Sequence, residues 1–202
     1  MLSTYKIKPK FQQLLKPVLV ALFKMGISAN AITWTAIILS AVTGVLFWLH
    51  PSGFMLLVLP IVLLVRMALN ALDGMMARTY NMQSKQGEVL NEFGDVVSDL
   101  FLFLPFLKLI PPENSFAILL FLFLAVINEF AGLLGKAVSG DRRYDGPMGK
   151  SDRALLIGLS CIILYCWPGF LIYLDRIFLV ASFLLIISTG SRIYHTLKTP
   201  GQ

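Results

Sequence analysis

Six apolar runs, separated by short polar turns, follow one another along most of the chain. They cover approximately residues 31–49, 54–76, 88–110, 115–134, 154–167 and 170–191. About 20 apolar residues are needed for a helix to cross a bilayer. The fifth run is short by that measure, and we expect it to extend toward Asp152. The pattern predicts an all-α integral membrane protein with six transmembrane helices.

Residues 5–25 precede the first run and show an amphipathic pattern instead. Apolar residues recur at helical spacing from Ile7 to Leu22, and lysines mark the other side: Lys6, Lys8, Lys10 and Lys16. Such a helix is typical of a segment that lies in the membrane interface. A signal peptide is the competing interpretation, but the scattered lysines and the absence of a small-residue cleavage site argue against it. We expect one domain over residues 1–202, with an interfacial helix in 1–27 and a six-helix bundle in 28–202.

The composition supports insertion into a membrane. Hydrophobic residues make up 57% of the chain and charged residues 14%, whereas soluble domains have about 45–50% and about 25%. The net charge of +6 fits loops that face an anionic leaflet. A nucleic-acid-binding protein is excluded because the basic residues lie between the apolar runs and not along one polar face.

The positions of lysine and arginine predict the orientation in the membrane. If the N-terminus is inside, one side of the membrane collects most of the 17 basic residues. Lys108 and Arg176 fall on the other side, and Arg66 lies within the second run. We therefore expect a multi-pass protein of the cytoplasmic (inner) membrane with both termini in the cytoplasm.

Acidic residues occur deep within these apolar runs. Asp73, Asp95 and Asp99 lie on either side of the polar turn formed by residues 81–86, and Glu129 lies in the fourth run. An ionisable residue within a membrane span is costly and is a candidate for a functional role. The region of residues 66–99 is therefore the candidate functional site.

Helical spacing predicts how these residues meet. Asn70 and Asp73 share one face of the second predicted span, and Asn91 and Asp95 share one face of the third. If the two helices fold back about the turn, Asp73 and Asp95 meet at similar depth with the two asparagines beside them. Two carboxylates and two amide carbonyls suit a hard cation such as Mg²⁺ or Mn²⁺.

These residues carry a resemblance to the CDP-alcohol phosphotransferase (CDP-alcohol phosphatidyltransferase) family. The family pattern is D-x2-D-G-x2-A-R-x8-G-x3-D-x3-D, and the chain matches all but its first and third aspartates, with Asp73, Gly74, Ala77, Arg78, Gly87 and Asp95. Asn70 and Asn91 replace those two aspartates. Residues 30–33, Asn-Ala-Ile-Thr, are similar to the start of the first span in this family, and Gly149-Lys150 is similar to a Gly-Lys found in its members.

The resemblance implies a reaction and a set of roles. A phosphatidyl group would pass from a CDP-linked lipid, expected to be CDP-diacylglycerol, to the hydroxyl of a small alcohol in phospholipid biosynthesis, with release of CMP. The metal ligands would be Asp73, Asp95, Asn70 and Asn91, and Asp95 is also the candidate catalytic base. CDP or phosphate would be bound by Gly74, Ala77, Arg78 and Gly87. The resemblance also implies a homodimer.

The two asparagines change the expected metal site. Asparagine offers a metal a carbonyl oxygen but no negative charge. We therefore expect a single tightly held cation, or a second held weakly. Asp99 and Glu92 are candidate compensating acids, and Glu92 is the weaker because it lies about 100° round the helix from Asn91.

Each basic or acidic residue outside that set has two interpretations. Arg66 either forms a structural ion pair, with Asp99 as the expected partner, or contacts the diphosphate or the acceptor. Lys150 and Arg153 either bind an anionic acceptor or lipid phosphate, or only add to the charge facing the leaflet. Glu129 either makes a structural hydrogen bond or contacts the site.

Two other functions are compatible with the sequence. A catalytically weak or inactive lipid-nucleotide-binding subunit of a larger complex would explain Asn70 and Asn91. A small ion-coupled transporter would explain acids within the spans, but the polar cluster lies near the predicted cytoplasmic ends of two spans and not at the midplane. The sequence does not identify the acceptor alcohol.

Overall fold

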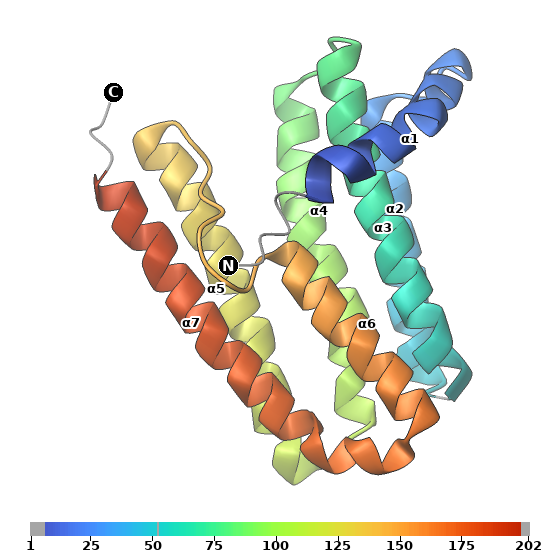
Figure 1. The fold of residues 1–202 in the computed structure, drawn as a ribbon, viewed down its shortest axis with the longest axis vertical. Coiled ribbons are helices and arrows are strands. Elements are labelled where there is room, and N and C mark those ends of the chain that lie inside the picture. Colours follow the sequence, from blue (N-terminus) through green and yellow to red (C-terminus); the bar gives the residue numbers. More distant parts are fainter. Residues whose placement is uncertain (1–6, 52, 199–202) are drawn as a thin grey trace.

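The computed structural model describes residues 7–51 and 53–198, and all regular structure in these ranges is helical (Figure 1). Lys6, part of the predicted amphipathic pattern, lies outside the described residues. The long helices are α1 (Ile7–Lys24), α2 (Ala29–Leu49), α3 (Gly53–Thr79), α4 (Lys85–Phe103), α5 (Ser115–Ser139), α6 (Lys150–Cys166) and α7 (Leu174–Lys198). Short 3₁₀ helices are η2 (Leu104–Lys108), η3 (Pro112–Asn114) and η4 (Pro168–Tyr173).

Each of the six predicted apolar runs corresponds to one helix from α2 to α7. Among the described residues, 4 helices are long and apolar enough to cross a membrane, namely α2, α3, α5 with η3, and α7 with η4. Helix α6 has 17 residues, and α4 carries Asp95 and Asp99. The predicted all-α membrane class is confirmed, while the count of six spans stays a prediction.

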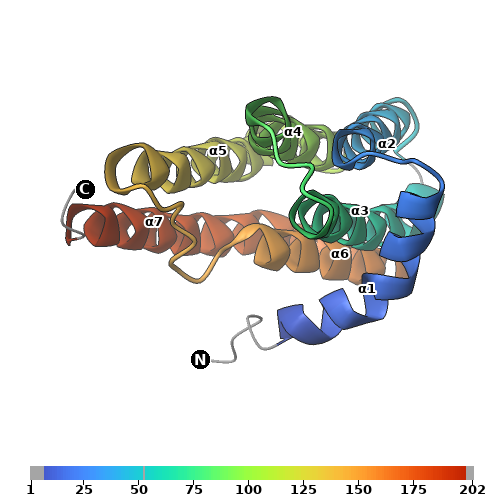
Figure 2. The same ribbon diagram turned by 90° about the horizontal axis from the view of Figure 1, so that it is seen from above.

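The helices form two layers. Seen from above, α2, α4 and α5 lie in one layer and α3, α6 and α7 lie in the other, with α1 outside against α3 (Figure 2). Neighbours in space are often distant in sequence, since α3 packs against α6 and α5 packs against α7. This arrangement brings the first turn of α6 next to the α3–α4 pair.

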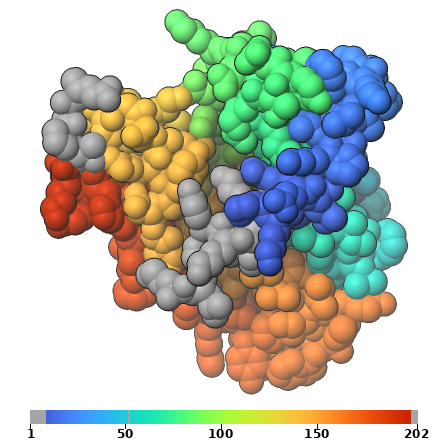
Figure 3. Space-filling view, turned by 45° about the horizontal axis from the view of Figure 1, so that its top comes forward, coloured from blue at the N-terminus to red at the C-terminus, as the bar shows by residue number. Residues whose placement is uncertain are grey.

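One end of the bundle gathers α1, the α3–α4 turn and the α5–α6 loop (Figure 3). The C-terminal end of α7 lies at the same end (Figure 1). This grouping agrees with the side predicted from the positions of lysine and arginine. That this end faces the cytoplasm stays a prediction.

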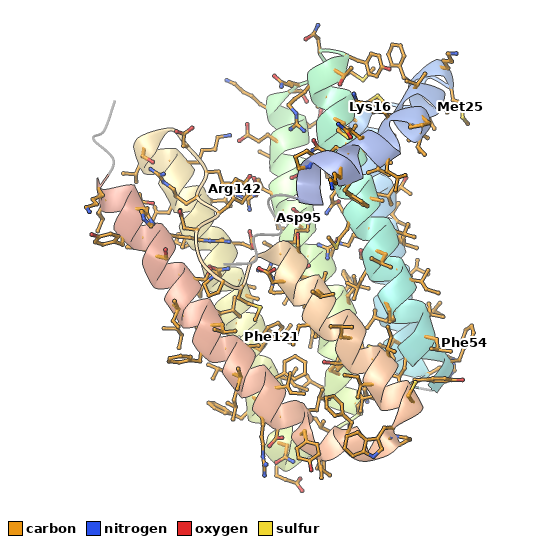
Figure 4. The ribbon with its side chains drawn as sticks, in the orientation of Figure 1. Lys16, Met25, Phe54, Asp95, Phe121 and Arg142 are labelled. Atoms are coloured by element: carbon orange, nitrogen blue, oxygen red, sulfur yellow. The ribbon has the colours of Figure 1, made fainter. Side chains whose placement is uncertain are left out.

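Buried aromatic rings fill the other half of the bundle. Phe178 of α7 contacts Phe121 of α5 with ring centroids 5.1 Å apart, and Phe106 of η2 at 5.8 Å. Phe47 of α2 meets Phe106 at 5.8 Å in an edge-to-face contact. Because these rings join both layers with favourable edge geometry, they hold the bundle together below the polar site (Figure 4).

Helix α1 is amphipathic, as predicted, and it docks on the bundle. Leu15 and Leu19 are buried in a small cluster with residues of α2 and α3. Leu14 and Val18 remain exposed, as does Lys16. The helix continues through Pro17, although this proline lies in its interior. The position of α1 in the membrane interface stays a prediction.

Glycine allows α2 and α4 to approach closely at two levels. A Cβ atom on Gly44 of α2 would overlap the carbonyl oxygen of Phe101 in α4. A Cβ atom on Gly94 of α4 would overlap the side chain of Ile37 in α2. Small residues at helix contacts are a general means of close packing in membranes.

Gly44→Ala should therefore destabilise the protein by about 1–3 kcal/mol, because backbone cannot move aside as a flexible side chain can. The measurement is unfolding of the detergent-solubilised protein by heat or denaturant. Gly190→Ala on α7 is the matched control, since a Cβ atom there meets nothing within 4 Å. Equal stability of the two variants would contradict this account of α2–α4 packing.

Candidate functional site

Two hydrogen bonds link α3 and α4 at the candidate site, and in each an asparagine of one helix donates to an aspartate of the other. Asn91 of α4 donates from Nδ2 to Oδ2 of Asp73 over 3.0 Å, and Asn70 of α3 donates from Nδ2 to Oδ1 of Asp95 over 3.0 Å. Each helix thus supplies one acid and one amide to the other. The meeting of these four residues at similar depth, predicted from their spacing, is confirmed.

Thr33 of α2 adds a third helix to this group. Its hydroxyl donates to Oδ2 of Asp73 over 2.8 Å, and the side chain is buried. Ser28 starts α2 here, because its side chain accepts a hydrogen bond from the backbone N–H of Ala31. Sequence reasoning noted residues 30–33 only as a motif, and that motif was the available signal for Thr33.

Lys150 reaches Asp95 from the first turn of α6. Its Nζ contacts Oδ1 of Asp95, the same oxygen that accepts from Asn70. The backbone N–H of Gly149 donates to Oδ2 of Asp152 over 2.9 Å and fixes the start of the helix. Figure 4 shows Asp95 beside this end of α6. The structure therefore brings Lys150 into the candidate site.

Asp99 lies one turn below Asp95 and is held by two arginines. Arg66 contacts its Oδ1 over 2.5 Å, and Arg153 contacts its Oδ2 over 2.8 Å. Arg66 also donates to the backbone carbonyl of Asp95 over 2.9 Å. The predicted Arg66–Asp99 pair is confirmed. Because both oxygens of Asp99 bind guanidinium groups, the structure places this candidate compensating acid in an ion pair and not beside Asp73.

Glu129 of α5 is the centre of a second buried ion network. Arg142 lies 2.7 Å from its Oε2, Arg153 lies 2.8 Å from its Oε1, and Arg192 of α7 lies 3.9 Å away. Arg142 also contacts Oε1 of Glu92 over 2.6 Å. Glu92, the other candidate compensating acid, is thus directed toward Arg142. These contacts make the structural interpretation of Glu129 and Arg153 the better supported one.

Arg142 belongs to the α5–α6 loop and extends between α5 and α4 (Figure 4). Burial acts to lower the pKa of its guanidinium, but the charges of Glu92 and Glu129 outweigh burial and raise the pKa above its ordinary value. Arg142 therefore stays charged at every pH of interest. No pattern in the sequence marked Arg142 as part of this network.

Side chains of α5 and α7 donate hydrogen bonds to backbone carbonyls of the α5–α6 loop and hold it against the bundle. Asn128 donates to the carbonyl of Met148 over 3.2 Å, and Ser188 donates to the carbonyl of Asp145 over 3.0 Å. Gly146 has φ +103° and lies so close to Ser188 that a side chain would overlap it. The loop thus holds Gly149 and Lys150 in place at the site.

The remaining motif residues lie around the cluster. A Cβ atom on Gly74 would lie 3.3 Å from Nη1 of Arg78, which is exposed, and Ala77 is half-buried. A Cβ atom on Gly87 would lie 2.6 Å from Oδ1 of Asn30. A larger residue at position 87 would therefore require the Asn30 side chain to move. Binding of CDP or phosphate by these residues stays a prediction.

The donor set fits one divalent cation but is short for two. Asp73 and Asp95 supply two carboxylates, and each asparagine can add a carbonyl oxygen after its amide turns. Within residues 7–51 and 53–198 no three His, Cys, Asp or Glu side chains are grouped as metal ligands. A Mg²⁺ or Mn²⁺ ion at the four predicted ligands stays a prediction.

A hollow of about 260 Å³ between α2 and η2 lies at the other end of the bundle. Its lining is apolar and includes Gly44, Trp48 and Phe101. It contains none of the acids, so the polar cluster of α3, α4 and α6 remains the candidate site.

Comparison with known proteins identifies the family. Residues 26–188 match the family model for CDP-alcohol phosphatidyltransferase. The chain is 46% identical over 191 residues to the inner membrane protein YnbA of Escherichia coli (strain K12), covering 95% of this chain and 94% of that protein. The chain belongs to the CDP-alcohol phosphatidyltransferase family.

Solved structures share the fold. Phosphatidylinositol phosphate synthase (PgsA1) of Mycobacterium tuberculosis with CDP-DAG bound has a TM-score of 0.78 at 20% identity, covering 94% of this chain and 96% of that chain. The same protein in complex with manganese and citrate has a TM-score of 0.76 at 20% identity, covering 92% and 90%. The fold is thus that of a family member whose structures include a CDP-linked lipid and a divalent metal.

Proposed function

We propose that this protein transfers a phosphatidyl group from CDP-diacylglycerol to the hydroxyl of a small alcohol and releases CMP, in the cytoplasmic membrane. The observation that carries the proposal is the meeting of Asp73 and Asp95 across α3 and α4, within the family motif. The CDP-DAG complex of the structurally similar synthase supports the choice of donor.

In this proposal the chain's own residues have distinct roles. Asp95 accepts the proton of the acceptor hydroxyl, whose oxygen then attacks the β-phosphorus as the bond to the departing CMP breaks. Asp73 and Asp95, with Asn70 and Asn91, would hold a divalent cation. When bound, that cation offsets the charge of the diphosphate and of the leaving CMP. Thr33 fixes the orientation of the Asp73 carboxylate.

The contacts of Arg66 and Arg153 suggest an indirect role for both residues. Each guanidinium is buried and bound to Asp99. They would therefore fix the lower turn of α4 and so the position of Asp95. Among the predicted contacts to phosphate or acceptor, this leaves Lys150 as the best-placed residue, because its side chain is 25% exposed and reaches Asp95, whereas those of Arg66 and Arg153 are buried.

A lipid-nucleotide-binding subunit is the second candidate. The observation in its favour is that the chain's own donors bind both acids: Thr33 and Asn91 on Asp73, and Asn70 and Lys150 on Asp95. Such a site is stable without a cation. A family member of this kind would bind a CDP-linked lipid without turning it over.

The two candidates differ in one measurement. Purified protein is incubated with CDP-diacylglycerol and Mn²⁺ against a panel of small alcohols, and CMP release is followed with and without each alcohol. We expect release that depends on one acceptor and stops on addition of a chelator. Binding of CDP-diacylglycerol without release for any alcohol would instead support the binding subunit.

A further inference from the structure

The ammonium group of Lys150 lies against Asp95, one of the two carboxylates of the candidate metal site. Its ammonium group contacts Oδ1 of Asp95, and the side chains of Lys150 and Asp95 are 25% and 14% exposed. Residue 150 begins α6, and the hydrogen bond between Gly149 and Asp152 holds that helix end in place. The contact between Lys150 and Asp95 is therefore built into the fold.

The balance of charge in the site favours one divalent ion. Asp73 and Asp95 carry two negative charges, whereas Asn70 and Asn91 are neutral. Arg66 lies 3.7 Å from Oδ1 of Asp95, and its charge is offset by Asp99. One divalent cation together with the Lys150 ammonium already exceeds the negative charge of Asp73 and Asp95. A second divalent cation would leave the half-buried site strongly positive, which is costly where water is scarce.

The hydrogen bonds show the same preference. Asn70 and Asn91 present Nδ2 atoms to the two carboxylates, so both amides act as donors to the acids. On the Asp95 side, the amide of Asn70 and the ammonium of Lys150 share one oxygen. The chain's own donors thus bind Oδ2 of Asp73 and Oδ1 of Asp95.

We propose that the Lys150 ammonium supplies the positive charge of a second divalent cation, so that the chain binds one such ion and not two. This inference rests on the proposed function for its catalytic part. A lysine ammonium is a compact charge with three donors, and it binds phosphate well. Lys150 would offset the charge that develops on the diphosphate during transfer, beside the single bound ion.

Mn²⁺ binding to the purified protein without substrate tests the inference. Titration followed by electron paramagnetic resonance gives the number of ions per chain and the Kd. We expect one ion in the wild type. In Lys150→Met the Kd should fall roughly tenfold or more, because the ion no longer competes with an ammonium for Asp95.

CMP release by the same variants gives the second readout. In Lys150→Met it should fall about 10²-fold, as when one charge-stabilising group is lost, although Mn²⁺ binds more tightly. Opposite changes in Mn²⁺ binding and CMP release distinguish a charge-supplying lysine from one that merely blocks the ion. Lys150→Arg should retain the wild-type ion count, and it controls for folding.

Lys136→Met is the matched control. Lys136 pairs with Glu88 in an exposed contact outside the cluster, so its loss should change neither readout. Two ions per wild-type chain, no bound ion, an unchanged Kd in Lys150→Met or undiminished release by that variant would overturn the inference. If the wild type releases no CMP, the proposed function fails, and the ion count and Kd still decide whether Lys150 stands in for a second ion.

Discussion

Asp95→Asn should reduce acceptor-dependent CMP release by about 10²–10⁴-fold, the range associated with loss of a positioned general base. The substitution keeps the size of the side chain but removes its charge and its ability to take a proton. It also removes the negative charge that pairs with Lys150 and with the predicted cation. The measurement is the initial rate of CMP release at saturating acceptor and Mn²⁺.

The structure provides a control of the same chemistry outside the site. Glu88→Gln removes an acid of the same helix, α4, whose exposed partner is Lys136. This variant should retain the wild-type rate. If Asp95→Asn keeps more than a tenth of the wild-type rate while Glu88→Gln is normal, Asp95 is not the base, and the proposed roles in the site must be redrawn.

Arg153→Met should lower the free energy of unfolding by about 3–5 kcal/mol, the usual cost of removing one partner from a buried ion pair. Arg153 is 1% exposed and contacts both Asp99 and Glu129. Its loss leaves two buried carboxylates with fewer donors and separates the α4 and α5 parts of the network. The measurement is unfolding of the solubilised protein without substrate.

Arg176→Met is the control for this variant. Arg176 is exposed near the start of α7 and lies 5.9 Å from the ring centroid of Tyr173. Its replacement should change stability by less than about 1 kcal/mol, as expected for an exposed charge. A comparable loss in both variants would show that the buried network does not distinguish Arg153 from a surface arginine.

Local spacing was sufficient to predict the central pairing. Asn70 and Asp73 on one helix, and Asn91 and Asp95 on the next, share faces because the α-helix has a fixed period. A short turn between two helices then fixes which levels face each other. The Arg66–Asp99 pair followed from the same reasoning, and the structure contains it.

Spacing was not sufficient for contacts between helices that are distant in the chain. Thr33 reaches Asp73 from α2, and Arg142 reaches Glu92 and Glu129 from the α5–α6 loop. The sequence of a single segment does not indicate which acid a distant arginine will contact. Helix geometry marked Glu92 and Asp99 as candidate compensating acids. It could not show that Arg142 binds Glu92 and Arg153 binds Asp99.

The all-α membrane class and the helical hairpin around the turn could be predicted from the sequence, because they depend on apolar length and on the period of one helix. The family motif could be read from residue types and their spacing. The packing of the helices brings the start of α6 next to α4, so that Lys150 contacts Asp95. It also decided that Glu129 joins the arginines of the loop, α6 and α7. Such contacts depend on how whole helices pack, because a buried charge forms an ion pair with the opposite charge that the packing brings close to it.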